Sequence, residues 1–166
     1  MIQVVKAPDP YNATPCKSVF LAGSIEMGRA DPWQEHLTNQ IKTSLGHQEL
    51  LILNPRRNDW DSSWKQEKEN ETFHQQVSWE LKGLEDADCI ICFFQSGTIS
   101  PISLLELGLY ARSKKIIVIC EEGFHRKGNV DIVCERYDIP QCQTLDEAVI
   151  ALEKMLFNKK PIYEIQ

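Results

Sequence analysis

The chain has 166 residues, 42% of them hydrophobic and 25% charged, a composition typical of one soluble globular domain. Its 18 basic and 24 acidic residues give a net charge of −6, which argues against a general binder of nucleic acid polymers or anionic membranes. No apolar run is long enough to span a bilayer, and the first residues lack the apolar core of a signal peptide. We therefore expect a single cytoplasmic domain over residues 1–166.

In chain order, residues 17–22 predict a strand, and Asp31 and Pro32 then predict the N-cap and first position of a helix. Residues 50–53 predict a second strand, followed by the polar loop NPRRNDWDSSW, and a second helix is expected over 72–85. The residues expected to face the core are Trp33, Leu37, Ile41 and Leu45 in the first helix, and Val77, Leu81 and Leu84 in the second.

The second half continues the alternation of strands and helices. Strands are predicted over residues 89–94, 116–120 and 141–143, and helices after Ser100, over 130–137 and after Thr144. This order indicates an open parallel α/β sheet of five strands with helices on both faces. Ligands of such sheets bind at the carboxyl ends of the strands, so the loops that follow the strands should surround one crevice.

Cysteine and histidine spacing does not point to a cofactor. Cys89 and Cys92 form a CxxC, but they lie in a predicted strand, where positions three apart point to opposite faces. A redox CxxC would open a helix, so we interpret the six cysteines as structural and expect a reducing compartment. The four histidines show no metal-ligand spacing, and we expect neither a metal nor a cofactor.

Two loops at the predicted crevice are candidates for ligand binding. Gly23, Ser24 and Ile25 begin a loop between strand and helix whose backbone N–H groups could hold phosphate or sugar oxygens. It lacks the glycine pattern of known dinucleotide loops, and a structural turn is an equally good interpretation. In the second loop Asp59 and Trp60 could contact a substrate, with a tryptophan stacked on a base, or they could belong to an ion-paired surface loop.

The most informative residue is Glu106, a carboxylate placed among leucines in the third helix. A buried charge costs several kcal/mol unless it is paired, so this acid is either bound to an arginine or kept for chemistry. It shares a helix face with Ser103 and Tyr110. Ser100, at the start of this helix, is an N-cap or a contact for a ligand hydroxyl or phosphate.

Four segments together resemble the nucleoside 2-deoxyribosyltransferase family, and most closely its second, shorter-motif branch. They are GSIEMGRADPWQ, NPRRNDWD, WELKGLEDADCIICFF and TISPISLLELG. The resemblance implies a flavodoxin-like sheet and an enzyme that exchanges bases on 2′-deoxyribonucleosides. It implies that Glu106 is the nucleophile, which attacks C1′ to give a covalent deoxyribosyl-enzyme with overall retention. Glu80, where many relatives have aspartate, would bind the sugar hydroxyls.

The chain departs from the family pattern at two positions. Ser100 replaces an aspartate that holds the 5′-hydroxyl in many members, and it resembles instead the related nucleoside 5′-monophosphate N-glycosidases, whose serine contacts phosphate. Phe20 stands where relatives often have a tyrosine that orients the nucleophile, and phenylalanine cannot donate a hydrogen bond. Hydrolysis of a nucleotide, and a non-catalytic nucleotide-sensing domain, therefore stay open beside base exchange.

The resemblance also implies the partners. Family members are homo-oligomers in which a neighbouring subunit completes each site, and Asn129 is the candidate for that contact here. The expected ligands are small-molecule deoxynucleosides and free nucleobases, with no nucleic acid polymer and no membrane.

Overall fold

The computed structural model describes residues 1–13, 15–25, 30–57 and 63–158. Parallel strands form a sheet in the order β1-β3-β2-β4-β5-β6. The strands are β1 (Ile2–Lys6), β2 (Lys17–Gly23), β3 (Leu50–Asn54), β4 (Cys89–Phe94), β5 (Ile116–Cys120) and β6 (Gln141–Cys142). The helices are α1 (Trp33–Leu45), α2 (Glu71–Asp86), α3 (Pro101–Tyr110), α4 (Lys127–Tyr137) and α5 (Leu145–Leu156), with a 3-10 turn, η2 (Ala111–Ser113), after α3.

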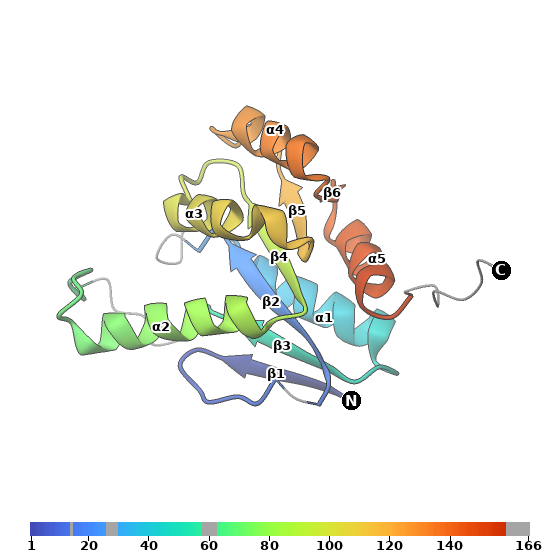
Figure 1. Cartoon of the computed structure of the whole chain (residues 1–166), viewed down its shortest axis with the longest axis horizontal. Coiled ribbons are helices and arrows are strands. Elements are labelled where there is room, and N and C mark those ends of the chain that lie inside the picture. Colours follow the sequence, from blue (N-terminus) through green and yellow to red (C-terminus); the bar gives the residue numbers. More distant parts are fainter. Residues whose placement is uncertain (14, 26–29, 58–62, 159–166) are drawn as a thin grey trace.

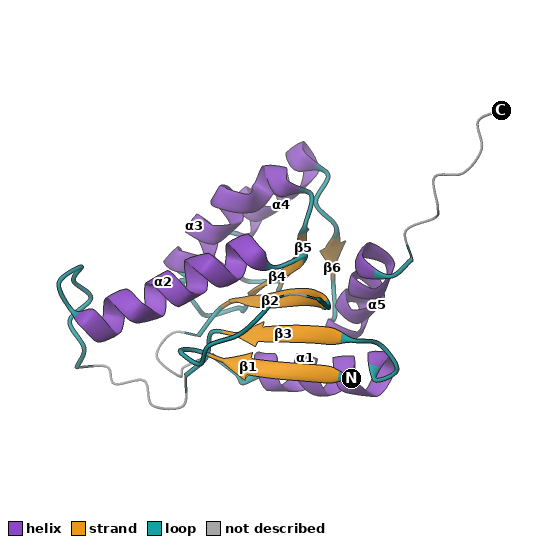
Figure 2. Ribbon diagram, turned by 60° about the horizontal axis from the view of Figure 1, so that its bottom comes forward, coloured by secondary structure: helices purple, strands orange, loops and turns teal. Residues whose placement is uncertain are grey.

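The helices cover both faces of the sheet, as predicted. Figures 1 and 2 show α2, α3 and α4 on one face and α1 and α5 on the other. Each face has its own apolar core, and alternate residues of a strand enter different cores, so Phe20 packs under α2 whereas Val19 and Leu21 pack toward α1. Without β1, the strand order is that of flavodoxin-like folds, which confirms the predicted fold class.

The sheet has six strands rather than the predicted five. The additional strand, β1, pairs in parallel with β3 at the edge of the sheet. Only Val5 of this strand is buried, and its neighbours are polar or partly exposed. Such an edge strand needs few apolar residues, because one side has no neighbouring strand and its faces are only partly covered. The segment therefore lacks the continuous apolar run that identified the central strands.

The inward face of α2 agrees with the prediction at Leu84 but differs from it at Val77 and Leu81. Its buried residues are Gln76, Trp79, Gly83 and Leu84, whereas Leu81 is 43% exposed and Val77 is only partly buried. Gly83 explains the rotation, since a Cβ at this position would lie 2.7 Å from the ring of Phe20. The glycine lets the helix backbone approach the sheet closely, and this close approach selects the buried face.

Helix starts show one further correction. Asp31 is not the N-cap of α1; Pro32 occupies that position, and the Asp31 carboxylate accepts a hydrogen bond from Gln95 Nε2 at 2.7 Å. The predicted buried row of α1 is confirmed. Thr144 caps α5 as predicted, its hydroxyl accepting the N–H of Glu147 at 3.1 Å.

All six cysteines are free, and five of them are buried. Cys89 and Cys92 belong to the cores on opposite faces of the sheet, as their spacing predicted. Burial raises the pKa of both thiols, so neither is activated as a thiolate. Among the helices within the described ranges, none is long and apolar enough to cross a membrane.

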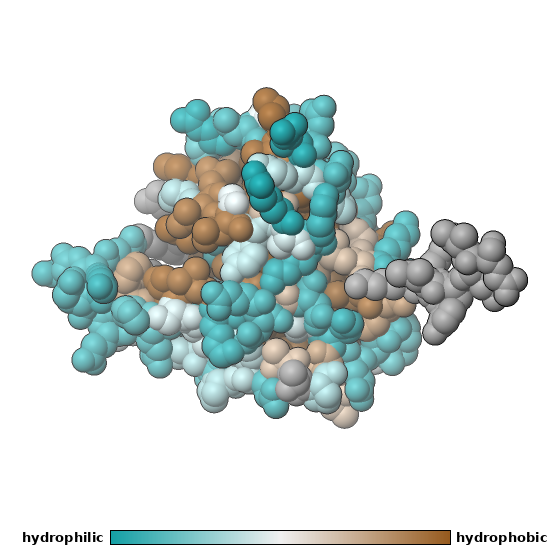
Figure 3. Space-filling model, in the orientation of Figure 1, coloured by the Kyte–Doolittle hydropathy of each residue, from teal (hydrophilic) through white to brown (hydrophobic). Residues whose placement is uncertain are grey.

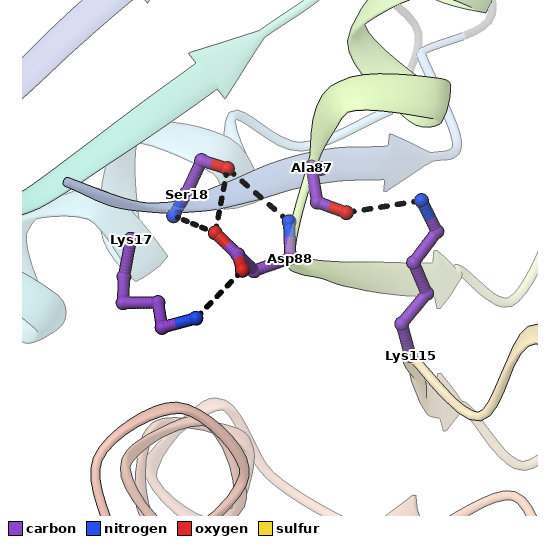
Figure 4. Close-up of polar contacts among 5 residues, drawn as sticks. All are labelled: Lys17, Ser18, Ala87, Asp88 and Lys115. Atoms are coloured by element: carbon purple, nitrogen blue, oxygen red, sulfur yellow. Dashed lines mark hydrogen bonds and ion pairs between the residues drawn. The ribbon is translucent and has the colours of Figure 1, made fainter. Parts of the chain in front are cut away.

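The amino ends of the central strands are tied together by paired charges (Figure 4). Asp88 accepts hydrogen bonds from Lys17 Nζ at 2.8 Å and from the N–H of Ser18 at 3.0 Å. Lys115 Nζ donates to backbone oxygens at the end of α2, including Ala87 O at 3.0 Å. These contacts fix the α2–β4 junction.

Candidate active site

The strand order reverses between β2 and β4, and the loops after these two strands form the base of the candidate site. β2 ends at Gly23, which has φ of +146°. A Cβ there would lie 2.4 Å from the carbonyl oxygen of Phe93 and 2.8 Å from the Trp33 ring, so only glycine fits. The next residue, Ser24, donates its N–H to Phe93 O at 2.9 Å, and its carbonyl accepts the indole N–H of Trp33 at 2.9 Å.

A buried cluster of hydroxyls joins the two loops. Ser24 Oγ lies 2.6 Å from Ser100 Oγ and 2.9 Å from Thr98 Oγ1, and the latter two are 2.9 Å apart. Thr98 also donates to Gln95 O at 2.8 Å. Ser100 occupies the N-cap position predicted for it, but its left-handed φ of 46° turns the hydroxyl into this cluster rather than onto the helix N–H groups. The cluster fixes the start of α3 against the end of β2.

Glu106 lies on the inner face of α3 and is only 8% exposed. Burial, together with the negative charge of Glu80, raises its pKa from 4.5 to about 8. Within the described part of the chain, no side chain forms an ion pair with this carboxylate and none donates a hydrogen bond to it. The interpretation of Glu106 as a structural acid paired with an arginine therefore finds no support among these residues, and a buried acid without compensation is typical of functional sites.

Glu80 comes from α2, the helix beside α3 on the same face of the sheet (Figure 1). Burial raises its pKa, and a hydrogen bond from Gln76 Nε2 to Glu80 Oε1 at 2.8 Å partly offsets that increase. The fold therefore brings together two carboxylates that lie on different helices. Because one charge acts on the other, protonation of either acid alters the ionisation of its neighbour.

No side chain in the described part of the chain orients Glu106 by a hydrogen bond, and Phe20 is not able to do so. Phe20 is fully buried and packs on Gly83 and on Trp79, with ring centroids 6.1 Å apart in the latter pair. It fills space beneath α2 and provides no donor. Ser103 is buried on the same face of α3, and the charge of Glu106 contributes to the raised pKa of the Tyr110 hydroxyl, after burial and Glu85. Neither hydroxyl is hydrogen-bonded to Glu106 in this structure.

The remaining residues that the sequence suggested as substrate contacts do not lie together in the described structure. Ile25 is half-buried after Ser24, and its carbonyl accepts the N–H of Ala30 at 3.4 Å. Asp59 and Trp60 lie outside the described residues. Asn129 is exposed in the first turns of α4, on a pocket of about 340 Å³ between α3 and α4. The pocket is lined by Leu104, Leu107, Gly108, Arg126, Asn129, Val130 and Val133.

Sequence reasoning did not identify Gln76 and Thr98, two residues that shape the site, and it considered Arg56 only as part of a charged loop. Gln76 precedes Glu80 by one helical turn, a spacing that could have indicated their contact. Thr98 has no signal beyond its closeness to Ser100. Arg56 belongs to the charged loop after β3, and its guanidinium donates to the carbonyls of Ala30 at 3.2 Å and Asp31 at 2.9 Å. It therefore supports the loop before α1.

Among the residues described, no three histidine, cysteine, aspartate or glutamate side chains lie close enough to form a metal site. A conserved protein from Enterococcus faecalis V583 has a crystal structure that matches with a TM-score of 0.58 at 15% identity, over 86% of this chain and 100% of that one. At this identity the likeness shows the fold alone, an α/β protein with an open parallel sheet.

The motifs that form the site identify the family. The model of the family described as nucleoside 2-deoxyribosyltransferase like matches residues 16–124, from just before β2 to just before α4. The matched segment includes both loops of the switch point, Glu80 and Glu106. The chain belongs to this nucleoside 2-deoxyribosyltransferase-like family. No curated protein matches it.

Proposed function

We propose that the protein is a nucleoside 2-deoxyribosyltransferase, with Glu106 as its nucleophile and Glu80 as the acid that binds the sugar hydroxyls. The observation that carries the proposal is the pair of carboxylates on α2 and α3, of which Glu106 is buried and Glu80 is partly buried; burial and the charge of Glu80 raise the pKa of Glu106. Such a pair costs stability, and base exchange provides a use for both acids. Membership of the family makes a nucleoside the expected substrate.

The proposed reaction has two displacements at C1′. The ionised Glu106 carboxylate attacks C1′, the C1′–N bond breaks, and the departing base keeps the electron pair and takes up a proton. A second base then attacks C1′, displaces the Glu106 carboxylate and loses its own proton. Two inversions give net retention, as in retaining glycosidases. The apolar wall around Glu106 favours transfer over hydrolysis by keeping water from the ester.

In the proposal, the other predicted site residues surround the substrate bound at Glu106. Gly23, Ser24 and Ile25 form the wall beneath the sugar, and Ser100 lies at its 5′ end. Asp59 and Trp60 would contact the base. All six cysteines are free, which fits the reducing, cytoplasmic setting that we propose.

We further propose that the active form is a homo-oligomer in which Asn129 of one copy completes the site of another. Its support is an exposed apolar surface formed by Ile99, just before α3, and by Ile102, Leu105 and Leu109 on the outer face of α3. These four side chains are 58–63% exposed. Figure 3 shows an apolar surface over α3 that continues toward α2. Light scattering should find an oligomer that Leu105→Glu dissociates and that Ile150→Glu, a control on the opposite face, leaves intact. A monomeric, fully active wild type contradicts this part of the proposal.

A base-exchange assay tests the function directly. Purified protein is incubated with a deoxynucleoside and a different free base, without phosphate, and the new deoxynucleoside is measured. We expect exchange by the wild type and by Glu135→Gln, a control at an exposed acid on α4, and none by Glu106→Gln. Absence of exchange with every deoxynucleoside of a purine and pyrimidine panel rejects the proposal.

The same assay separates the nucleotide alternative. The Ser100 hydroxyl lies within a buried cluster, 2.6 Å from Ser24 Oγ, so a phosphate contact would have to replace a contact already made. We therefore favour free deoxynucleosides. Deoxyribose 5-phosphate formed from a deoxynucleoside monophosphate would support the N-glycosidase, and tight calorimetric binding without turnover would support the sensing domain.

A further inference from the structure

Gln76 is the least expected residue in the inner face of α2. It is 3% exposed, although glutamine is usually found at the surface. Its Nε2 donates to Glu80 Oε1 at 2.8 Å, one turn later on the same helix, and to Pro55 O at 3.0 Å, in the segment that follows β3. One side chain thus joins Glu80 to the loop at the carboxyl end of the sheet.

The direction of the Gln76 amide is determined by its partners. Both groups facing Nε2 are acceptors, a carboxylate oxygen and a carbonyl oxygen, so the reversed amide would place oxygen against oxygen. With Nε2 committed in this way, Gln76 Oε1 is buried and has no hydrogen-bond partner among the residues that the structure describes. Burying an unpaired acceptor costs free energy, and an apolar side chain of similar size would avoid that cost.

We infer that Gln76 is a positioning residue for Glu80: it fixes the direction of the carboxylate so that Glu80 meets the sugar hydroxyls of a deoxynucleoside with its acceptor lone pairs. This inference rests on the proposed function, because it assigns Gln76 a part in binding the same substrate. The free-energy cost of burying Gln76 Oε1 is then explained by the amide orientation that Glu80 requires.

The electrostatic surroundings of Glu80 agree with this role. The hydrogen bond from Gln76 favours the ionised carboxylate and opposes the rise in pKa caused by burial. The charged group that faces it from α3 is Glu106, which has the same sign. Lys82, on the same helix, forms an ion pair with Asp86 instead. Over the described ranges, no lysine, arginine or histidine forms an ion pair with Glu80. The neutral Gln76 amide therefore provides the stabilisation of the Glu80 anion that a cation would otherwise provide.

The test compares Gln76→Leu with Gln75→Leu, a matched change at the exposed neighbouring position on α2. In the exchange assay we expect Gln76→Leu to raise KM for the deoxynucleoside at least about tenfold, with a smaller effect on kcat. On acidification, KM should begin to rise at a higher pH than in the wild type, because Glu80 without the hydrogen bond protonates more readily. Gln76→Asn, whose shorter amide cannot reach both partners, should resemble Gln76→Leu. An unchanged KM and pH profile in a folded Gln76→Leu overturns the inference.

Carboxyl ¹³C NMR makes the inference independent of turnover. In the wild type the Glu80 side-chain carbon should titrate at a lower pH than in Gln76→Leu, while Gln75→Leu should match the wild type. If the wild type shows no exchange but this difference is observed, the proposed function fails and the contact that positions Glu80 stands. If exchange is observed but the titration of Glu80 is the same in all three proteins, the role of Gln76 is wrong and the function stands.

Discussion

The pKa values of acids at the two ends of the sheet are shifted in opposite directions. At the amino end, burial alone would raise the pKa of Asp88, but hydrogen bonds from Lys17 and Ser18 and the charge of Lys17 hold it below its ordinary value. At the carboxyl end, burial and a second acid raise the pKa of Glu106 to about 8. Asp88 has a cation at 2.8 Å, whereas Glu106 has no ion-pair partner in the described part of the chain.

The difference separates a structural acid from a reactive one. A paired carboxylate is stable as an anion and a poor nucleophile, because its lone pairs are already engaged. An unpaired carboxylate in an apolar wall is a high-energy anion that forms a covalent bond more readily. Since the two kinds of acid lie in one fold and on one chain, substitutions at each can be compared directly.

The largest expected effect is the loss of base exchange in Glu106→Gln. The amide cannot attack C1′, so exchange should fall by more than about 10³-fold, while Asp88→Asn should keep its activity per folded molecule. Initial rates of product formation, measured by chromatography and normalised to folded protein, provide the comparison. Comparable losses in both variants would remove the distinction between the two ends.

The next effect is on the pH dependence of kcat/KM. Because Glu106 reacts as the anion, the acidic limb should have a midpoint near the pKa of about 8. Glu80→Gln removes a like charge, so the pKa of Glu106 should fall and the limb should move to lower pH, while the loss of sugar contacts raises KM. Glu85→Gln, an exposed acid on α2, is the control. If the midpoint of the acidic limb is the same in Glu80→Gln and in the wild type, the charge of Glu80 does not affect the pKa of Glu106.

A smaller effect should be seen in thermal stability. The pKa of Glu106 is raised on folding from 4.5 to about 8, so folding favours its protonated form, and stability should decrease as pH rises across that interval. Glu106→Gln removes this dependence, and its Tm should exceed that of the wild type at pH 8 but not at pH 4.5. Calorimetry at the two pH values gives the comparison. A Tm difference that is independent of pH would show that ionisation of Glu106 does not oppose folding.

The smallest effect, and one of opposite sign, is expected at Asp88. Its pKa is lowered from 3.8 on folding, so its contribution is present above that pH and is lost as pH falls through the folded value. Asp88→Asn should lose about 1–2 kcal/mol at pH 7, because the ion pair with Lys17 is partly exposed and screened. Urea unfolding at pH 7 and pH 3 checks this. Equal losses at the two pH values would contradict the ionic origin of the contribution.

The sequence predicted the elements whose stability comes from their own residues. The central strands are continuous apolar runs, and the buried row of α1 follows helical period, so both were correct. The inward face of α2 was predicted correctly at Leu84 but not at Val77 and Leu81, because it depends on how Phe20 meets Gly83, a contact between distant segments. The edge strand β1 was missed because pairing with β3, rather than its own burial, defines it.

The site was predictable to a similar degree. Glu106 could be found because an acid among leucines is anomalous in the sequence itself. Its proximity to Glu80 required the family resemblance, since no spacing rule joins residues on different helices. The hydroxyl cluster at Ser24 could not be predicted, because it depends on the left-handed backbone of Ser100 and on the register of β2 with β4.

Mass spectrometry of a quenched reaction tests the central claim most directly. Wild-type protein is mixed with a deoxynucleoside in the absence of an acceptor base, quenched in acid and digested. We predict one added deoxyribosyl group on the peptide that contains Glu106, lost on addition of a free base and never formed by Glu106→Gln. Full exchange activity with no adduct, or with the adduct on another residue, would contradict the account.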